Sequence, residues 1–355
     1  MWLKGSAKNI IAIMVDRFVD QVHYRIPEST PKKFKSSVFG GLKNKERGNF
    51  EDVLENTIYQ KSGCNTNGCG NPVLTSDDVT DFGDVDFVAD PFLLPLKDEI
   101  HLFFEVMNRD KKPNSAIGHA TSDNGHEWAY DQIVLETGRH VSFPFIFENE
   151  GDYYMLPEQS DPKSDIIELY KANSFPTEWK RCSTLLEPEF DVQDAILFQW
   201  DEYWWLLIGS GHYDEIHLYY SNFLERNEWH AHKNNPVVTD RQSGAKPAGR
   251  PIITEERIIL FLQDCVREYG DKVRVYTVDQ LNPTEYSDTE SPFSPVIEGT
   301  GGVGWNSGRM HHIDPHWIGG EKWICAVDGD IGFPRGYVTG DHWSIGIYHA
   351  VGRNI

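Results

Sequence analysis

Short apolar runs recur along the chain in pairs, and residues of a different character open and close each pair. In the first pair Asp90 stands beside a proline, an apolar run follows, and Glu105 closes a second run. Alternation of apolar and polar positions around such runs is typical of a β-strand rather than a helix. Four further pairs are opened by Phe143, Asp194, Arg250 and Asp314. The five opening residues are 53, 51, 56 and 64 residues apart, so the chain repeats one strand pair five times.

Each of the first four copies continues with a third apolar run and then an aromatic residue preceded by Glu, at Trp128, Trp179, Trp229 and Tyr286. Four short strands in a unit of about 50 residues are typical of a propeller blade. The fifth copy has a third run at 343–348 and no fourth. The segment 71–75 matches 235–239, the tail of a copy, and is expected to supply the missing strand. The sequence therefore predicts an all-β fold, a five-bladed β-propeller closed by an N-terminal strand.

Residues 1–70 resemble no other part of the chain and are expected to form an N-terminal extension or lid, irregular apart from a short helix within 10–22. Residues 71–355 are expected to form the propeller. Cys64 and Cys69 could bridge a small loop, and the alternative is that they are free thiols of a cytoplasmic protein.

Charge and hydropathy narrow the classes of partner. With 33 basic and 55 acidic residues the formal net charge is −22, which disfavours nucleic acid and anionic lipid surfaces. No apolar run approaches the roughly 18 residues of a membrane span, and no small-residue cleavage site follows the short apolar run at 10–15. We therefore expect a cytoplasmic protein without a membrane span. The 11 Trp, 15 Tyr and 19 Phe suit strands and sugar-facing surfaces.

The opening residues carry the candidate chemistry. Equivalent positions of propeller blades converge on one axis, so these five residues are expected to form a ring in a shared funnel. The residues that close the second runs are expected to form another ring: Glu105, Glu158, Gly209, Asp264 and Asp328. Carboxylates gathered around one guanidinium cost desolvation and repel each other, which is tolerated when they are paired or functional. Glycoside hydrolysis needs two such carboxyls, one to protonate the leaving group and one to activate water.

Structural alternatives exist for several of these residues. The Asp-Pro pair at Asp314 is also a turn device, and Glu105 and Asp328 could be ordinary strand-end residues. The histidines near Asp314, among them His312 and His316, have no Cys or second His pair at ligand spacing, so zinc is not expected and no cofactor is required. These imidazoles could bind substrate hydroxyls or neighbouring carboxylates, or one could join the shell of a structural Ca²⁺ or sodium ion on the propeller axis.

Several motifs together resemble a known family. They are 71–75 with 87–92, 143–145 with 156–158, 249–251 with 263–265, and 310–316. Over about residues 71–348 the chain is similar to the N-terminal domain of glucosamine inositolphosphorylceramide transferase, a domain itself similar to the five-bladed propellers of glycoside hydrolase family 43. The separate glycosyltransferase domain of that protein has no counterpart in these residues, so the resemblance does not imply sphingolipid glycosylation.

The likeness to family 43 implies a role for each matching position. Asp90 matches the general base that opens blade one, and Asp194 matches the Asp of blade three that orients and tunes the site. Arg250 stands where the family has its general-acid Glu. The resemblance therefore implies that another carboxyl, Glu158 or Asp264, protonates the leaving group, or that the site binds glycan without cleaving it.

Three interpretations remain open, the third being that the chain is a fragment of a larger glycosyltransferase assembly. The first is a glycoside hydrolase, of the inverting type, that acts on a glycan or glycoconjugate through Asp90, Asp194, Glu158 and Asp264. Its substrate would be bound by Phe143, Arg250, His312, Asp314, His316 and Glu105, with Arg250 neutralising the carboxylates or holding an anionic sugar. The second is a non-catalytic glycan-binding module that has lost its general acid and is accessory to glycosyl transfer.

Overall fold

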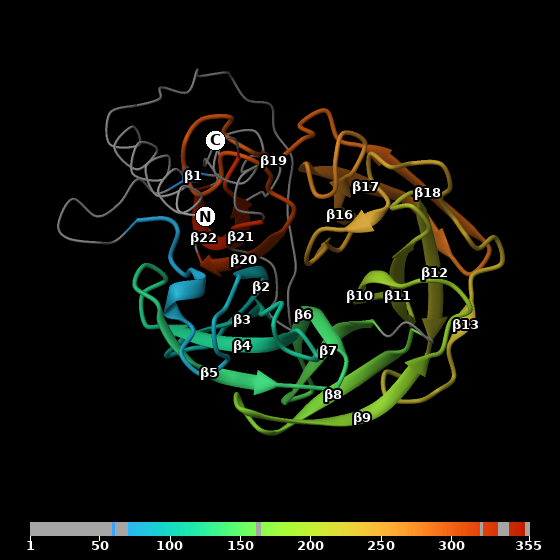
Figure 1. Cartoon of the computed structure of the whole chain (residues 1–355). Coiled ribbons are helices and arrows are strands. Elements are labelled where there is room, and N and C mark those ends of the chain that lie inside the picture. The colour runs from blue at the N-terminus through green and yellow to red at the C-terminus, as the bar shows by residue number, and fades with distance from the viewer. Residues whose placement is uncertain (1–58, 61–69, 161–164, 320–321, 333–340, 352–355) are drawn as a thin grey trace, which may run out of the picture.

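Five antiparallel sheets surround a central axis in the computed structural model, which describes residues 59–60, 70–160, 165–319, 322–332 and 341–351 (Figure 1). The described residues contain one short 3₁₀ helix, η1 (Ser76–Asp78), and are otherwise strands and loops. The predicted all-β, five-bladed β-propeller is confirmed. Among these residues no helix is long and apolar enough to cross a membrane.

The strands follow the predicted repeat. Blade one contains β2 (Phe87–Pro95), β3 (Ile100–Met107), β4 (Ser115–Ser122) and β5 (Ala129–Leu135). Blade two contains β6 (His140–Asn149), β7 (Asp152–Ser160), β8 (Ile167–Ser174) and β9 (Glu178–Leu186). Blade three contains β10 (Gln193–Trp200), β11 (Tyr203–Ser210), β12 (Glu215–Ser221) and β13 (His230–Ala231). Blade four contains β14 (Lys246–Pro247), β15 (Ile252–Ile253), β16 (Ile258–Asp264), β17 (Lys272–Asn282), β18 (Glu285–Glu290) and β19 (Ile297–Glu298). Blade five contains β20 (Ile313–Gly319), β21 (Lys322–Asp330), β22 (Trp343–Val351) and β1 (Tyr59–Gln60).

The hydrophobic core lies between neighbouring blades. One large cluster joins residues of blades one to four, a second joins blades four and five, and a third joins blade five to blade one. Because a strand alternates its side chains between two faces, each blade can bury one face against the preceding blade and the other against the next. The third cluster, which includes Phe104 and Ile345, holds the last blade against the first.

The innermost strands of the first three blades bulge at the opening residue. Asp90, Phe143 and Asp194 have φ values of 51°, 45° and 61°, and the strand register shifts beside each of them. Positive φ is uncommon for residues other than glycine, and a bulge redirects the side chain that it carries. The repeat thus places a backbone distortion, as well as a residue type, at the same point of each blade.

Blade four departs from this pattern. Its inner strand is divided into β14 and β15 by an irregular stretch around Gly249, which has φ +135°. A Cβ on this glycine would lie 1.9 Å from the carbonyl oxygen of Ile313, so the close approach of blade five requires the absence of a side chain. Arg250 follows directly, which places it beyond the break rather than on a bulge like those of Asp90 and Asp194.

Two asparagine side chains each form a pair of hydrogen bonds with the backbone N–H and carbonyl groups of one strand residue. Asn71 donates to the carbonyl of Ile347 and accepts from its N–H, at 3.0 and 2.8 Å. Asn235 makes the same two bonds with Leu218, at 2.7 and 2.9 Å. The predicted equivalence of 71–75 and 235–239 is therefore confirmed.

The start of the described chain meets its end at blade five. Beyond Asn71, Leu74 bridges Ile345, and β1 pairs with β22. A continuous N-terminal strand that closes the ring stays a prediction. The expected extension or lid at 1–70, with Cys64 and Cys69, lies outside the described residues apart from β1 and residue 70.

Replacing Asn71 tests the contact between chain start and chain end. Asn71→Ala leaves the N–H and carbonyl of Ile347 without these partners, which is expected to lower the free energy of unfolding by about 1–3 kcal/mol in urea denaturation. Asn235→Ala should cost a similar amount. The control is Asn173→Ala, which removes an exposed bond to Glu178; a cost for Asn71→Ala no larger than that of the control would contradict the role.

Candidate active site

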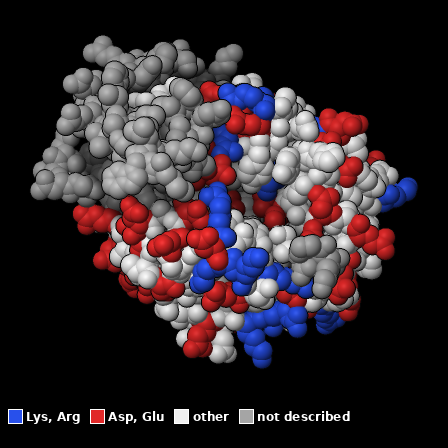
Figure 2. Space-filling view, viewed as in Figure 1, with Lys and Arg blue, Asp and Glu red and all other residues white. Residues whose placement is uncertain are grey.

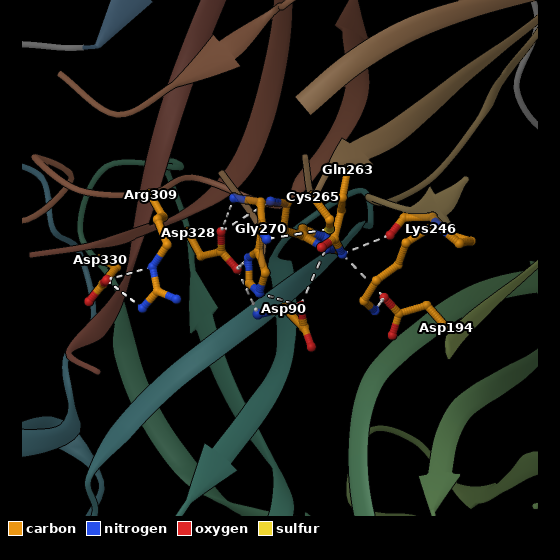
Figure 3. A network of polar contacts seen from close by, with 12 residues as sticks. Asp90, Asp194, Lys246, Gln263, Cys265, Gly270, Arg309, Asp328 and Asp330 are labelled. Atoms are coloured by element: carbon orange, nitrogen blue, oxygen red, sulfur yellow. Dashed lines mark hydrogen bonds and ion pairs between the residues drawn. The ribbon is translucent and has the colours of Figure 1, made fainter. Parts of the chain in front are cut away.

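A cluster of four carboxyls and one lysine occupies one end of the propeller axis. Asp90 and Asp194 come from the bulged inner strands β2 and β10, and Glu105 and Glu158 come from the adjacent strands β3 and β7. Lys246 comes from β14 in blade four. Four blades thus contribute one group each or more, and Figure 3 shows Asp90, Asp194 and Lys246 from different blades facing a common space. Figure 2 shows acidic and basic side chains around the hollow in the middle of the ring.

Lys246 and Asp194 form a buried ion pair. Lys246 Nζ contacts Asp194 Oδ2, and both side chains are at most 5% exposed. Gln263 Nε2 donates to the same oxygen at 3.3 Å. Burial lowers the pKa of Lys246, but nearby carboxylates, Asp194 first, more than offset this and raise it overall, so Lys246 stays cationic. Burial raises the pKa of Asp194 to about 8, although the ammonium group of Lys246 opposes that rise and favours the ionised carboxylate.

Asp90 is held by a second buried group, Asp328 of β21. Asp328 Oδ1 accepts the backbone N–H groups of His311 and His312, each at 3.1 Å. Its Oδ2 accepts the backbone N–H of Asp90 at 3.2 Å and lies 2.7 Å from His311 Nδ1. Glu158 does the same for blade three, because its Oε2 accepts the backbone N–H of Asp194 at 2.5 Å. In both cases a carboxyl on the second strand of one blade accepts a hydrogen bond from the backbone of the opening residue of the next blade.

Among the described residues Glu105 has one ionisable side chain within ion-pair distance, and that group is a histidine. Glu105 is 6% exposed, and this histidine is His140, whose Nε2 lies 3.7 Å from Glu105 Oε1. Burial raises the pKa of Glu105 well above its ordinary value, and the charges of Asp90, Glu158 and Asp194 raise it further. Burial also lowers the pKa of His140, so this imidazole is neutral near pH 7. These effects favour the protonated form of Glu105 near pH 7.

An aromatic layer closes the axis below this cluster. Phe92, Phe143 and His312 are fully buried, and their ring centroids lie 4.6–5.4 Å apart in edge-to-face contacts. Phe143 and His312, both predicted to bind substrate, therefore form the floor under the carboxyls. Burial lowers the pKa of His312, which keeps it neutral.

Arg250, Asp314 and His316 lie beyond this layer. Arg250 Nε donates to Asp314 Oδ1 at 2.8 Å, and its Nη2 donates to the carbonyl of Ile146 at 2.5 Å. Asp314 Oδ2 accepts the backbone N–H of Leu93 and lies 3.0 Å from His316 Nε2. The expected single ring of five opening residues is therefore wrong: the structure divides it between two levels of the axis, because blade four is interrupted at Gly249.

Asp264 and Lys246 also depart from the expectation. Asp264 accepts from Arg274 Nε at 2.7 Å and from the backbone N–H of Val266, so its carboxylate is occupied by groups outside the Asp90 cluster. Lys246 was missed by the sequence analysis although a signal was present. It follows Asp194 by 52 residues, close to the preceding intervals of 53 and 51, and it precedes a proline as Asp90 does. Arg250 also precedes a proline, and the apolar run begins directly after that proline.

Asp90, His311 and Asp328 offer ligand atoms within 4.8 Å of one another, so this group is the candidate site for the expected axial calcium ion. Calcium takes six to eight oxygen ligands. Both oxygens of Asp328 already accept two donors each, and one further group is an imidazole. The residues fit a hydrogen-bonded support better than a calcium shell, and an axial ion stays a prediction.

Sequence comparison identifies related proteins. A family model described as "Glucosamine inositolphosphorylceramide transferase 1, N-terminal" matches residues 50–330. Proteins named glucosamine inositolphosphorylceramide transferase 1 from Oryza sativa subsp. japonica and Arabidopsis thaliana are 36% and 34% identical over 271 and 273 residues. Each match covers 73% of this chain but only 35% and 34% of the relative. The chain thus spans about a third of the length of the curated relatives it matches.

Several solved structures with a similar fold are named as glycoside hydrolases. A thermostable family-43 glycoside hydrolase matches with a TM-score of 0.55 and 15% identity, covering 77% of this chain and 91% of its own. A glycosyl hydrolase from Bacteroides ovatus matches at 0.58 and 13%, covering 79% and 92%. The catalytic domain of a GH62 α-L-arabinofuranosidase from Coprinopsis cinerea matches at 0.56 and 12%, covering 75% and 91%. At these identities the likeness shows the fold alone.

The protonated state of Glu105 has a consequence for stability. The folded-state pKa of Glu105 lies above its unfolded-state value of about 4.3. The stability that its bound proton contributes is therefore complete below the unfolded-state pKa and is lost as the pH rises through the folded-state pKa. Glu105→Gln does not titrate there. Its unfolding free energy, measured in urea from pH 5 to 8, should therefore rise relative to wild type by up to about 1.4 kcal/mol per pH unit. Glu256→Gln, at an exposed position, is the control; a difference that stays flat or falls with pH would refute the protonated state.

Proposed function

We propose that this chain, which belongs to the family of the glucosamine inositolphosphorylceramide transferase 1 N-terminal domain, binds a glycan at the Asp90 cluster and hydrolyses a glycosidic bond there. The observation that supports the proposal is that the carboxyls of the site differ in their ion-pair partners and in the shifts of their pKa values. Asp194 is paired with Lys246 and Asp328 with His311, whereas Glu105 lies 3.7 Å from His140, whose pKa is lowered by burial, and its own pKa is raised. Glycoside hydrolysis needs one protonated and one ionised carboxyl in the same site.

Asp90 and Glu105 are assigned the two roles. Burial raises the pKa of Asp90 and His311 opposes this, while the pKa of Glu105 is raised well above its ordinary value. In the proposed mechanism Asp90 acts in its ionised form and takes a proton from water, and Glu105 acts in its protonated form and donates one to the leaving oxygen. Water then adds to the anomeric carbon as the bond to the leaving group breaks, which gives inversion when the two carboxyls lie on opposite faces of the sugar.

Lys246, Asp194 and Glu158 support this chemistry without carrying it out. Lys246 adds a positive charge beside the carboxyls, which favours ionisation of Asp90 over a fully protonated cluster. Glu158 is half-buried and fixes the backbone of Asp194, so it is the carboxyl of the cluster with the most access to solvent and to a bound sugar. Asp264 is not used, because Arg274 occupies it.

One observation favours the second function, glycan binding without cleavage. The residue that blade four contributes to the cluster is Lys246, a cation that cannot protonate a leaving group while it is paired with Asp194. If Glu105 cannot reach the glycosidic oxygen, the same pocket would hold sugar hydroxyls between carboxylates and an ammonium group. The curated relatives are named as transferases, so such a module would be accessory to glycosyl transfer.

Turnover by matched variants separates the two functions. Wild type is screened against aryl glycosides and oligosaccharides, and products are identified by NMR. Asp90→Asn and Glu105→Gln should each lower kcat by about 10²–10⁴-fold. The pH profile of wild type should be bell-shaped, and Glu105→Gln should lose the limb at higher pH. Glu256→Gln should behave as wild type.

Three results would contradict these assignments. Binding of a glycan that Asp90→Asn weakens, without any turnover by wild type, would reject hydrolysis and leave the binding module. Turnover that persists in Asp90→Asn would reject the assignment of the site. A protein that neither binds nor cleaves any member of the panel would reject both functions.

A further inference from the structure

A second cavity lies at the opposite end of the inner strands from the Asp90 cluster. Its volume is about 740 Å³, and it lies between the hairpins that follow β6 and β10 and the turn between β15 and β16. Asp194 opens β10 and Asp201 follows its last residue, so the two ends are roughly 20 Å apart at ~3.3 Å per residue. The fully buried layer that contains Phe92 and Phe143 separates the cavity from the carboxyl cluster.

A buried cation, the guanidinium of Arg250, lies at the floor of the cavity and can donate further hydrogen bonds. Arg250 lines the cavity and its side chain is 7% exposed. Its Nε is bound by Asp314 and its Nη2 by the carbonyls of Leu93 and Ile146. Within the part of the chain that the structure describes, no hydrogen bond engages Nη1. A guanidinium nitrogen carries two N–H donors at this position, so the floor can donate to a ligand.

The walls are aromatic. Trp200 and Trp204 are half-buried, and the Trp204 ring lies 6.0 Å from the ring of Phe147, tilted by 46°. Phe147 in turn stacks on Tyr154 at 5.4 Å, which holds it in place. Indole faces that are neither fully buried nor fully exposed offer a flat apolar surface with a polar edge, the combination that suits a ligand with one apolar face.

The rim is acidic. Glu148, Glu150 and Asp201 line the cavity and are exposed. Glu148 Oε1 accepts the backbone N–H of Gly151 at 2.8 Å, which fixes its position at the hairpin. These carboxylates accept hydrogen bonds and donate none at neutral pH.

We propose that this cavity is a second carbohydrate-binding site and that its ligand is a neutral pyranose unit of a glycan. A ligand here must accept from Arg250 at the floor and donate to carboxylates at the rim, and hydroxyl groups do both. A cationic ligand would be repelled by the guanidinium of Arg250, and an anionic ligand would be repelled by the carboxylates of the rim. The C–H face of a pyranose packs against the indole walls while its hydroxyls reach floor and rim. The site is independent of the hydrolysis proposed for the other end of the axis.

The test is isothermal titration calorimetry of the full chain with three matched sets of oligosaccharides: neutral gluco- and manno-oligomers, amino-sugar oligomers and uronate oligomers. A neutral oligomer should bind, Trp204→Ala should weaken it at least tenfold, and Glu148→Arg, at an exposed position, should weaken it without affecting the fold. Asp90→Asn should leave this binding unchanged. Phe223→Ala, which removes a 42% exposed aromatic ring elsewhere, is the matched control.

Several results would overturn the proposal. Neutral oligomers that bind with equal affinity to wild type, Trp204→Ala and Glu148→Arg do not occupy this cavity. Binding that only Asp90→Asn removes belongs to the other end of the axis. Amino-sugar or uronate oligomers that bind at least tenfold more tightly than neutral ones would reject the ligand class, and no binding of any set would reject the site.

Discussion

The contact between Lys246 and Asp194 is the interaction on which the candidate site depends. Five inner strands converge on one axis, so any charged residue that they carry loses water and meets other charges at short range. Carboxyls from three blades at such a point would repel one another and take up protons. A buried ammonium group from the fourth blade compensates part of that charge, and it lets Asp90 and Asp194 coexist within one end of the ring. Glu105, whose one neighbour within ion-pair distance among the described residues is His140, has its pKa raised well above its ordinary value.

Backbone geometry decides which side chains take part in this balance. The bulges at Asp90 and Asp194 turn their carboxyls toward the axis, and backbone N–H groups at those same bulges are held by Asp328 and Glu158 from the preceding blades. Blade five is therefore fixed to blade one, and blade two to blade three, by a polar contact at the axis as well as by the apolar cores between blades. Phe92, Phe143 and His312 then fill the space below, so the two ends of the axis are separate chemical environments.

At the opposite end of the axis from the Asp90 cluster, Arg250 connects strands of different blades. Arg250 ties Asp314 of blade five to the inner strands of blades one and two, which closes the ring from within. The same guanidinium lines an aromatic cavity with an acidic rim. The chain belongs to the glucosamine inositolphosphorylceramide transferase 1 N-terminal family, and it shares its fold with glycoside hydrolases. The match covers about a third of the length of the curated relatives, so the activity of the unmatched part of those proteins is not assigned to this chain.

The sequence by itself determined the fold class, the number of blades and the location of Asp90, Glu105, Glu158 and Asp194 near the axis. It could do so because strand period and blade repeat are local patterns that recur every 50 residues or so. It also marked Asn71 and Asn235 as equivalents, since the same five-residue phrase surrounds both. Only the tertiary structure decided that Lys246 and not Arg250 meets Asp194. That choice depends on the break at Gly249, which the approach of Ile313 from another blade imposes. The protonation of Glu105 was likewise beyond the sequence, because it follows from burial and from charges contributed by three blades that are distant along the chain.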